Sequence, residues 1–105
     1  MSDMLFQLSA NIFKALAHPI RIKIITLLKG GEQCVCEILP QIESEQSNTS
    51  QHLAVLRNQG IVDSKKEGSM VVYRIKSPEV LQMIELAEQI IVKQIEETRL
   101  SLKKK

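Results

Sequence analysis

The chain has 105 residues, of which 44% are apolar, and this length and composition favour a single domain with one core. Only 3% are aromatic, which argues against a stacking platform for single-stranded nucleic acid. Because the net charge is only +2, any surface that binds nucleic acid must be a local basic patch. The sequence shows no signal peptide and no apolar run of transmembrane length, so we expect a cytoplasmic protein with no membrane partner.

Three helices are predicted in the first 42 residues. Apolar residues at helical spacing place the first helix over residues 5–16. The second begins at Pro19, because proline suits a first helical turn, and it ends before Gly30. A short third helix is predicted from four apolar residues that share one face: Val35, Ile38, Leu39 and Ile42.

A fourth helix and a β-hairpin follow. The helix covers residues 47–58 and stops at Gly60. Two strand-like runs, residues 61–66 and 70–76, flank a turn at Gly68, which is a hairpin signature. Ser77 and Pro78 open a last helix with a long apolar stripe. Short helices followed by a two-stranded wing make a mainly α fold with a small β-hairpin, the winged helix-turn-helix, and all 105 residues form one such domain.

The polar front of the fourth helix is the first candidate site. Its leading residues carry short polar or hydrogen-bonding side chains: Ser47, Asn48, Thr49, Ser50, Gln51 and His52. Such side chains exchange hydrogen bonds with base edges and phosphates, and the N–H groups of a helix N-terminus favour anions. Leu53 and Leu56 should dock the back of this helix on the core. His52 could contact a phosphate or pack against the preceding helix, and the sequence leaves both open.

The hairpin adds a basic wing next to this helix. Lys65, Lys66, Arg74 and Lys76 cluster on it and predict a local positive field. Taken alone, the polar helix could be an ordinary solvated face, but the basic hairpin beside it favours DNA binding. We therefore predict a double-stranded DNA operator as the partner.

Cys34 and Cys36 are the second candidate site. Residues i and i+2 lie about 200° apart around a helix, so they cannot both coordinate one ion from regular helical backbone. Pro40 has no N–H for the Cys36 carbonyl, which predicts a helix that starts near Glu37 or is distorted at Cys36. The thiols could then converge as reactive groups or as ligands of soft ions, a better use of this spacing than a structural disulfide. The alternative is that Cys34 extends an apolar face and Cys36 is incidental.

Three segments resemble the ArsR/SmtB family of metal-sensing repressors. Residues 15–25 resemble its entry segment, residues 50–57 its "SrHLavLR" recognition helix, and residues 60–75 its wing. The resemblance covers residues 8–76 and implies a homodimeric winged helix-turn-helix repressor that leaves its operator when an inducer binds. It adds Arg57 to the DNA-binding candidates and gives Arg21 a mainly structural role.

Residues 33–39 resemble the arsenite site of that family, with one departure. Leu39 stands where the third cysteine would be, so a trigonal As(III) site needs a small thiol, water or another residue. The N-terminal segment has no Cys and the last helix has no His or Asp, so the other metal sites of the family are not supported. The resemblance thus implies no required cofactor, with As(III), another soft ion or thiol oxidation as the candidate inducer.

The sequence favours a transcriptional repressor over an enzyme. It has no nucleophilic triad pattern, no acidic pair in a cleft-like motif and no Gly-rich phosphate loop. Two alternatives stay open: a winged-helix regulator with no small effector, and a winged-helix adaptor between proteins, which would not need the basic hairpin. The first and last helices carry more apolar surface than one small core uses, which predicts a homodimer formed through them.

Overall fold

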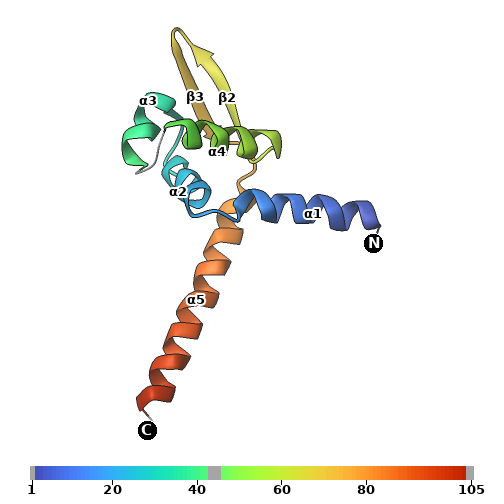
Figure 1. Ribbon diagram of the computed structural model, residues 1–105, viewed down its shortest axis with the longest axis vertical. Coiled ribbons are helices and arrows are strands. Elements are labelled where there is room, and N and C mark those ends of the chain that lie inside the picture. Colours follow the sequence, from blue (N-terminus) through green and yellow to red (C-terminus); the bar gives the residue numbers. More distant parts are fainter. Residues whose placement is uncertain (1, 43–45, 104–105) are drawn as a thin grey trace.

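A computed structural model describes residues 2–42 and 46–103 of the chain (Figure 1). Its helices are α1 (Asp3–Leu16), α2 (Pro19–Leu28), α3 (Val35–Ile38), the 3-10 helix η1 (Leu39–Gln41), α4 (Gln46–Asn58) and α5 (Glu79–Lys103). Its strands are β1 (Gln33–Cys34), β2 (Val62–Glu67) and β3 (Met70–Ile75). The prediction of a mainly α winged helix-turn-helix is confirmed.

Local capping sets where the first two helices begin. The Ser2 hydroxyl accepts a hydrogen bond from the Leu5 N–H at 3.2 Å, and His18 Nδ1 accepts one from the Ile20 N–H at 3.1 Å. Pro19 follows His18 in the first turn of α2, where a missing N–H removes no helical hydrogen bond. The sequence therefore separates α1 from α2 without a long loop.

The core lies between α2, α4 and the base of the sheet. Its fully buried apolar side chains include Ile24, Ile25, Ile38, Leu56, Ile61 and Val62. Burial of each such side chain contributes about 1.5–3 kcal/mol relative to leaving it in water. This core fixes α4 along one face of the domain, with the wing rising beside it (Figure 1).

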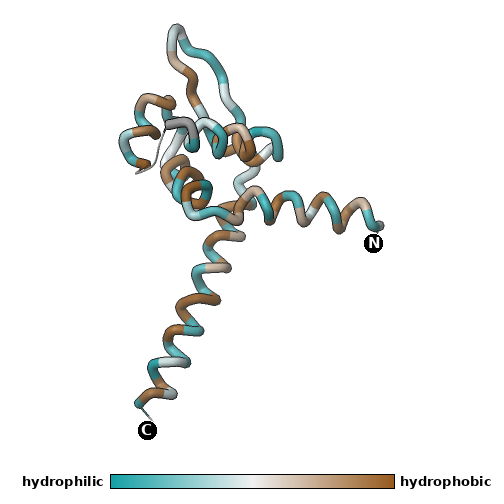
Figure 2. Tube along the Cα trace, viewed as in Figure 1, coloured by the Kyte–Doolittle hydropathy of each residue, from teal (hydrophilic) through white to brown (hydrophobic). Residues whose placement is uncertain are grey.

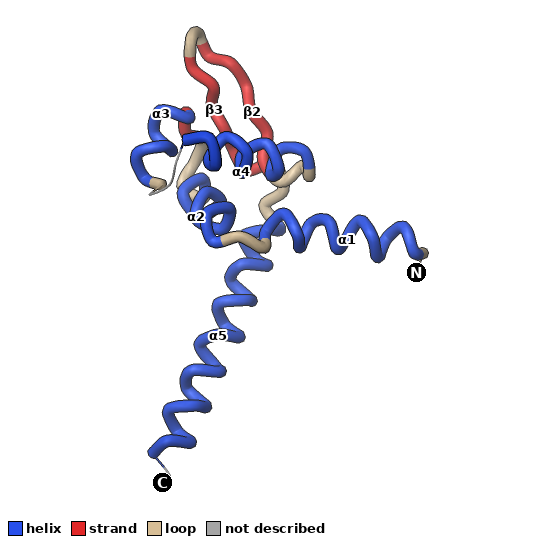
Figure 3. The backbone as a smooth tube through the Cα atoms, in the orientation of Figure 1, coloured by secondary structure: helices blue, strands red, loops and turns tan. Residues whose placement is uncertain are grey.

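The sheet has three antiparallel strands in the order β1-β3-β2, one more than the predicted hairpin. Figure 3 shows β2 and β3 as the long pair of strands that forms the wing. Their register runs from Val62 opposite Ile75 to Glu67 opposite Met70, and Gly68 has a φ of +63° in the tight turn. Two residues of β1 pair with the other edge of β3. A strand this short has no alternating pattern, which is why the sequence did not predict it.

The third helix is shorter than predicted and begins earlier. It ends at Ile38, and Pro40 lies in the first turn of the 3-10 helix that follows, so the missing proline N–H ends the α-helical bonding rather than delaying its start. Cys34 caps α3 instead, and its N–H donates to Glu37 Oε1 at 3.1 Å. The expected start near Glu37 is therefore wrong, and Cys36 lies inside the helix.

Helices α1 and α5 extend away from the core in different directions (Figures 1 and 2). Apolar residues recur along both, and many are more than half exposed: Met4, Phe6, Leu8, Phe13, Leu86, Ile90, Ile91, Val92, Ile95 and Leu102. Within residues 2–42 and 46–103, no helix is long and apolar enough to cross a membrane. The apolar surplus predicted for the first and last helices is thus left uncovered in one copy of the chain.

Candidate nucleic-acid interface

The outer face of α4 presents a polar surface. Asn48, Ser50 and Gln51 are exposed near its N-terminal end, and Arg57 is exposed near its C-terminal end. The side chain of Ser47 lies outside the described part of the chain. Amide and hydroxyl groups at this end of a helix can both donate to and accept from base edges. The structure therefore gathers three of the predicted side chains on one accessible surface.

Thr49 does not belong to this surface. Its side chain is fully buried, and it lies on the same face as Leu53 and Leu56, one and two helical turns further on. Helical periodicity thus places Thr49 in the core, and the prediction that it faces DNA needs correction. Its position within a six-residue polar run hid the fact that Thr49 points inward.

His52 also faces inward and connects α4 to the preceding helices. The Arg21 Nε–H donates to His52 Nδ1 at 3.0 Å, and the rings of His18 and His52 have centroids 4.2 Å apart. Burial, followed by the nearby His18 and Arg21, holds the pKa of His52 below its usual 6.5. The structure thus places His52 against Arg21 of α2 and against His18, the residue that caps α2.

The guanidinium of Arg21 extends this connection to the end of α1. A terminal nitrogen of Arg21 donates to the carbonyls of Lys14 at 3.3 Å and Ala15 at 3.5 Å. One side chain thus fixes α1, α2 and α4 relative to one another. Sequence reasoning missed the Arg21–His52 contact because the two residues are 31 positions apart.

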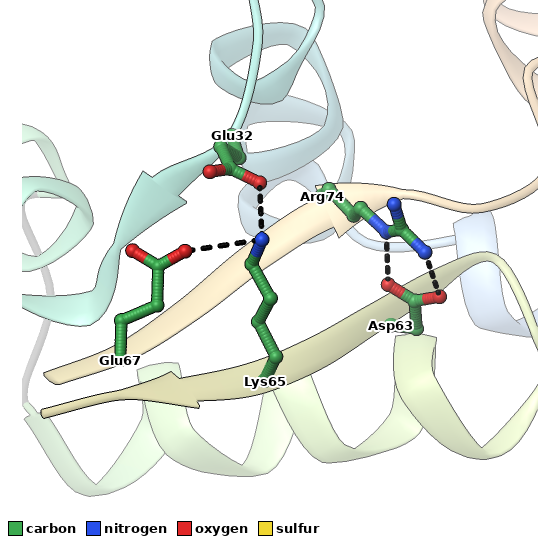
Figure 4. A network of polar contacts seen from close by, with 5 residues as sticks. All are labelled: Glu32, Asp63, Lys65, Glu67 and Arg74. Atoms are coloured by element: carbon green, nitrogen blue, oxygen red, sulfur yellow. Dashed lines mark hydrogen bonds and ion pairs between the residues drawn. The ribbon is translucent and has the colours of Figure 1, made fainter.

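The wing carries the predicted cations, but two of them already have acidic neighbours (Figure 4). Lys65 Nζ lies 3.0 Å from Glu67 and 3.5 Å from Glu32, and these carboxylates raise the pKa of Lys65. Arg74 makes a two-pronged contact with Asp63 at 2.8 and 3.3 Å, which lowers the pKa of the Asp63 carboxyl. Both ion pairs are exposed and therefore weak, so a phosphate can replace the carboxylate. The pairs reduce the predicted positive field of the wing without cancelling it.

The register separates Lys66 from these paired cations. Side chains alternate along β2, so Asp63, Lys65 and Glu67 share one face of the hairpin and Lys66 lies on the other. Lys66 is exposed and forms no ion pair within residues 2–42 and 46–103. Its charge is therefore the one on the wing strands most available to a phosphate.

The two cysteines converge, although not in the way the sequence suggested. They are joined by a disulfide, with their Cα atoms 5.2 Å apart. Cys34 lies in β1 and is 4% exposed, whereas Cys36 lies in α3 and is exposed. The spacing of two residues favours a structural disulfide poorly, but the change from extended to helical backbone between Cys34 and Cys36 brings the sulfurs together.

The disulfide opens onto a pocket of about 290 Å³ beside the wing. Its walls are Cys34, Val35, Cys36, Ser69, Met70 and Val71. Cys34 also pairs with Val72 across the sheet, so the sulfur pair is attached to a strand of the wing. Among the described residues, no group of three His, Cys, Asp or Glu side chains is placed to hold a metal ion.

A second pocket, of about 430 Å³, lies where α1, α2 and α5 meet. Its apolar lining includes Phe13, Leu16, Ile22, Met83, Ile84 and Ile91. It is continuous with the exposed apolar residues of the two extending helices, so it forms part of the same uncovered surface.

Comparison with known proteins agrees with this geometry. The sequence pattern described as "Bacterial regulatory protein, arsR family" matches residues 18–64. The crystal structure of Rv0081 from Mycobacterium tuberculosis is similar with a TM-score of 0.80 and 35% identity, over 91% of this chain and 97% of that one. The homodimeric winged helix-turn-helix DNA-binding domain of Mb0332 from Mycobacterium bovis has a TM-score of 0.78 and 29% identity, over 92% and 93%. A cadmium resistance transcriptional regulatory protein CadC homolog of Staphylococcus aureus is 42% identical over 74% of this chain and 65% of that protein.

Proposed function

This chain belongs to the arsR family of bacterial regulatory proteins, which are DNA-binding transcriptional regulators, and we propose that it acts as a homodimeric repressor. In this proposal α4 and the wing hold a double-stranded operator, and a change at Cys34 and Cys36 releases it. The observation that carries the proposal is the pairing of β1 with β3. It attaches the sulfur pair to a wing strand and gives chemistry at the sulfurs a path to the DNA-binding surface.

Operator recognition is divided between α4 and the wing. Asn48, Ser50 and Gln51 offer hydrogen bonds to base edges in the major groove, since they are exposed on a helix whose back is buried. Lys66 contacts phosphates directly. Lys65 and Arg74 do so once a phosphate has replaced their carboxylate partners. Base contacts then supply sequence preference, and wing contacts supply affinity.

The homodimer forms through α1 and α5. Their exposed apolar residues and the pocket between them would otherwise stay in water, whereas obligate dimers bury surfaces of this kind. Two-fold symmetry would present two copies of α4 to half-sites about one helical turn apart. The similarity to the homodimeric Mb0332 domain supports this arrangement.

The inducer acts on sulfur. In the reduced protein, Cys34 and Cys36 offer two thiolates to As(III), Cd(II) or another thiophilic ion, and the similarity to a cadmium resistance regulator supports this route. Oxidation is the second route: the two thiols give two electrons and two protons to an oxidant and form the disulfide. Either event changes the backbone where β1 joins α3, next to the wing.

Operator affinity in defined thiol states tests the proposal. An operator would first be selected from a random duplex library with reduced protein, and its dissociation constant measured by fluorescence anisotropy. We expect the reduced, ion-free protein to bind about 5–150-fold more tightly than the oxidised or arsenite-treated protein, the range of typical allosteric couplings.

The matched control is the double variant Cys34→Ser, Cys36→Ser, which should bind the operator with one affinity under every condition. Equal binding by the wild type in all three states would contradict the inducer role of the cysteines. The protein would then be a regulator that works without an effector at this site.

A further inference from the structure

A third sulfur lies beside the two cysteines. Met70 lines the same pocket of about 290 Å³ as Cys34 and Cys36. The strand register explains why: Cys34 is opposite Val72, and residues directly opposite each other project on the same face of a sheet. Met70 is two residues before Val72 on β3, so its side chain projects on that face too. Diagonal neighbours of this kind are about 7–8 Å apart at Cα, within reach of a long side chain.

The three sulfurs differ in accessibility in a way that suits an incoming ion. Cys34 is 4% exposed, whereas Met70 is 47% exposed and Cys36 lies at the surface. Methionine has three rotatable bonds and a polarisable thioether, so it can move over an ion held by the thiolates. An ion would thus bind the buried sulfur of Cys34 and be covered from the solvent side by the sulfurs of Cys36 and Met70.

We propose that the reduced pair Cys34 and Cys36, together with the Met70 thioether, forms a three-sulfur site for a monovalent soft ion of the Cu(I) class. This inference rests on the proposed function and names the ion that acts at its sulfur site. Thiolate and thioether donors are soft ligands of the kind that suits Cu(I). As(III) would instead need a third ligand such as a small thiol, water or another residue, and Zn(II) would need four ligands.

The chemistry balances with one external reductant. A dithiol gives two electrons and two protons to the Cys34–Cys36 disulfide and itself becomes a disulfide. The two thiols then release their protons as they bind the ion, whereas Met70 binds as a neutral ligand. No redox change of the ion is involved.

Binding would connect α3 to the tip of the wing. Met70 is the first residue of β3 and follows the tight turn at Gly68 and Ser69. An ion shared by Met70 and Cys36 would hold this turn against α3 and change how Lys66, two residues before Gly68, meets a phosphate. The bound ion would then link β3 to β1 and α3 reversibly, in addition to the two-residue pairing of the strands.

The test is Cu(I) binding by dithiol-reduced wild type and by Met70→Leu, which keeps the volume and removes the sulfur. Affinity would be measured by anaerobic competition with a chromogenic Cu(I) chelator, and sulfur ligands counted by X-ray absorption. We expect three Cu–S contacts in the wild type and two in the variant. We also expect a loss of affinity of at least about tenfold in the variant, because even outer-shell changes cost roughly 10–100-fold in metal affinity.

Two controls keep the result interpretable. Met4→Leu, on the exposed face of α1, should bind Cu(I) as the wild type does. Ion-free Met70→Leu should have the same far-UV circular dichroism and the same urea midpoint as the wild type, which shows that the variant is folded. If Met70→Leu kept three sulfur ligands and the wild-type affinity for Cu(I), the inference would be overturned.

Failure of the proposed function gives a different pattern. In one outcome, Cu(I) binds through three sulfurs while operator affinity responds neither to Cu(I) nor to any thiol state. That result would support the three-sulfur site and contradict regulation through the sulfurs. If oxidation released the operator while Met70→Leu changed nothing in Cu(I) binding, regulation would stand and the three-sulfur site would fall.

Discussion

The two parts of the proposed DNA-binding surface, α4 and the wing, are held in different ways. The buried residues Thr49, Leu53 and Leu56 and the His52–Arg21 hydrogen bond fix α4 to the core. The wing extends beyond the core, and two of its cations, Lys65 and Arg74, form exposed ion pairs whose carboxylate partners can be replaced. A rigid helix suits the reading of sequence, whereas a wing bordered by two cysteines suits the adjustment of affinity. In the proposed mechanism, a change at the cysteines can therefore alter the wing while α4 stays in place.

The largest effect should come from the helices that would bring two copies of both regions together. The double variant Ile91→Glu, Ile95→Glu places charges on an apolar face of α5 and should abolish dimerisation. Sedimentation at micromolar concentration should give a mass near twice 11.9 kDa for the wild type and a single copy for the variant. Lys93→Glu on the same helix is the control and should stay dimeric. A wild-type protein that is a folded monomer would contradict the proposed assembly.

The next largest effect should come from a substitution that weakens the packing of α4 on the core. Leu56→Ala removes a fully buried side chain and should lower the free energy of unfolding by about 2–5 kcal/mol, because the cavity does not close completely. Urea denaturation measures the loss. Lys66→Ala on the wing should change stability by less than about 0.5 kcal/mol, as exposed substitutions usually do. Similar losses at both positions would mean that the wing is as firmly packed as α4.

Operator binding should separate the two regions most clearly. Gln51→Ala should cost about 1–3 kcal/mol on the selected operator and little on random DNA, since it removes base contacts. Lys66→Ala should weaken binding to both and reduce the slope of log affinity against log salt by about 1, since it removes one phosphate contact.

Lys65→Ala and Arg74→Ala should have smaller effects than Lys66→Ala, because their charges are shared with Glu67 and Asp63. Anisotropy titrations on both DNAs at several salt concentrations measure these differences. Equal losses on selected and random DNA for Gln51→Ala would refute the division between reading and affinity.

The smallest expected effect is the pH dependence of the α4 anchor. Because the folded protein holds the pKa of His52 below 6.5, the unfolded chain binds more protons as pH falls below that value. The contribution of neutral His52 to stability is thus present above pH 6.5 and is lost as pH falls from there to the folded pKa. Denaturation between pH 8 and pH 5 should show a steeper decline for the wild type than for His52→Gln. If the free energy of unfolding fell equally with pH in both proteins, protonation of His52 would not be the cause of the decline.

Local patterns in the sequence were sufficient for most of the fold. The hairpin at Gly68, the start of α2 at Pro19 and the apolar back of α4 all follow from residues close together in the chain. The site was less predictable because its key contacts are long-range. The Arg21–His52 hydrogen bond and the position of Met70 beside Cys34 depend on tertiary packing and strand register, which no short pattern records.

The errors near the cysteines have one physical source. Pro40 was expected to disturb the beginning of the third helix, but a proline limits the hydrogen bonding of the residues before it only when the helix runs through it. Here α3 has ended by then, so Cys36 is helical and Cys34 is its extended cap. The inward direction of Thr49 was visible in the helical spacing with Leu53, and its polar neighbours outweighed that signal.

In the proposed mechanism the thiol state and operator binding are coupled, and thermodynamic linkage makes that coupling directly measurable. If the reduced protein binds the operator more tightly, the operator must stabilise the reduced form by the same factor. A coupling of 5–150-fold corresponds to a rise of about 20–65 mV in the reduction potential of the Cys34–Cys36 disulfide, at about 30 mV per tenfold for two electrons. The measurement is that potential in a dithiol redox buffer, with and without saturating operator. We expect a less negative reduction potential with the operator present; identical potentials would show that the thiol state and operator binding are not coupled.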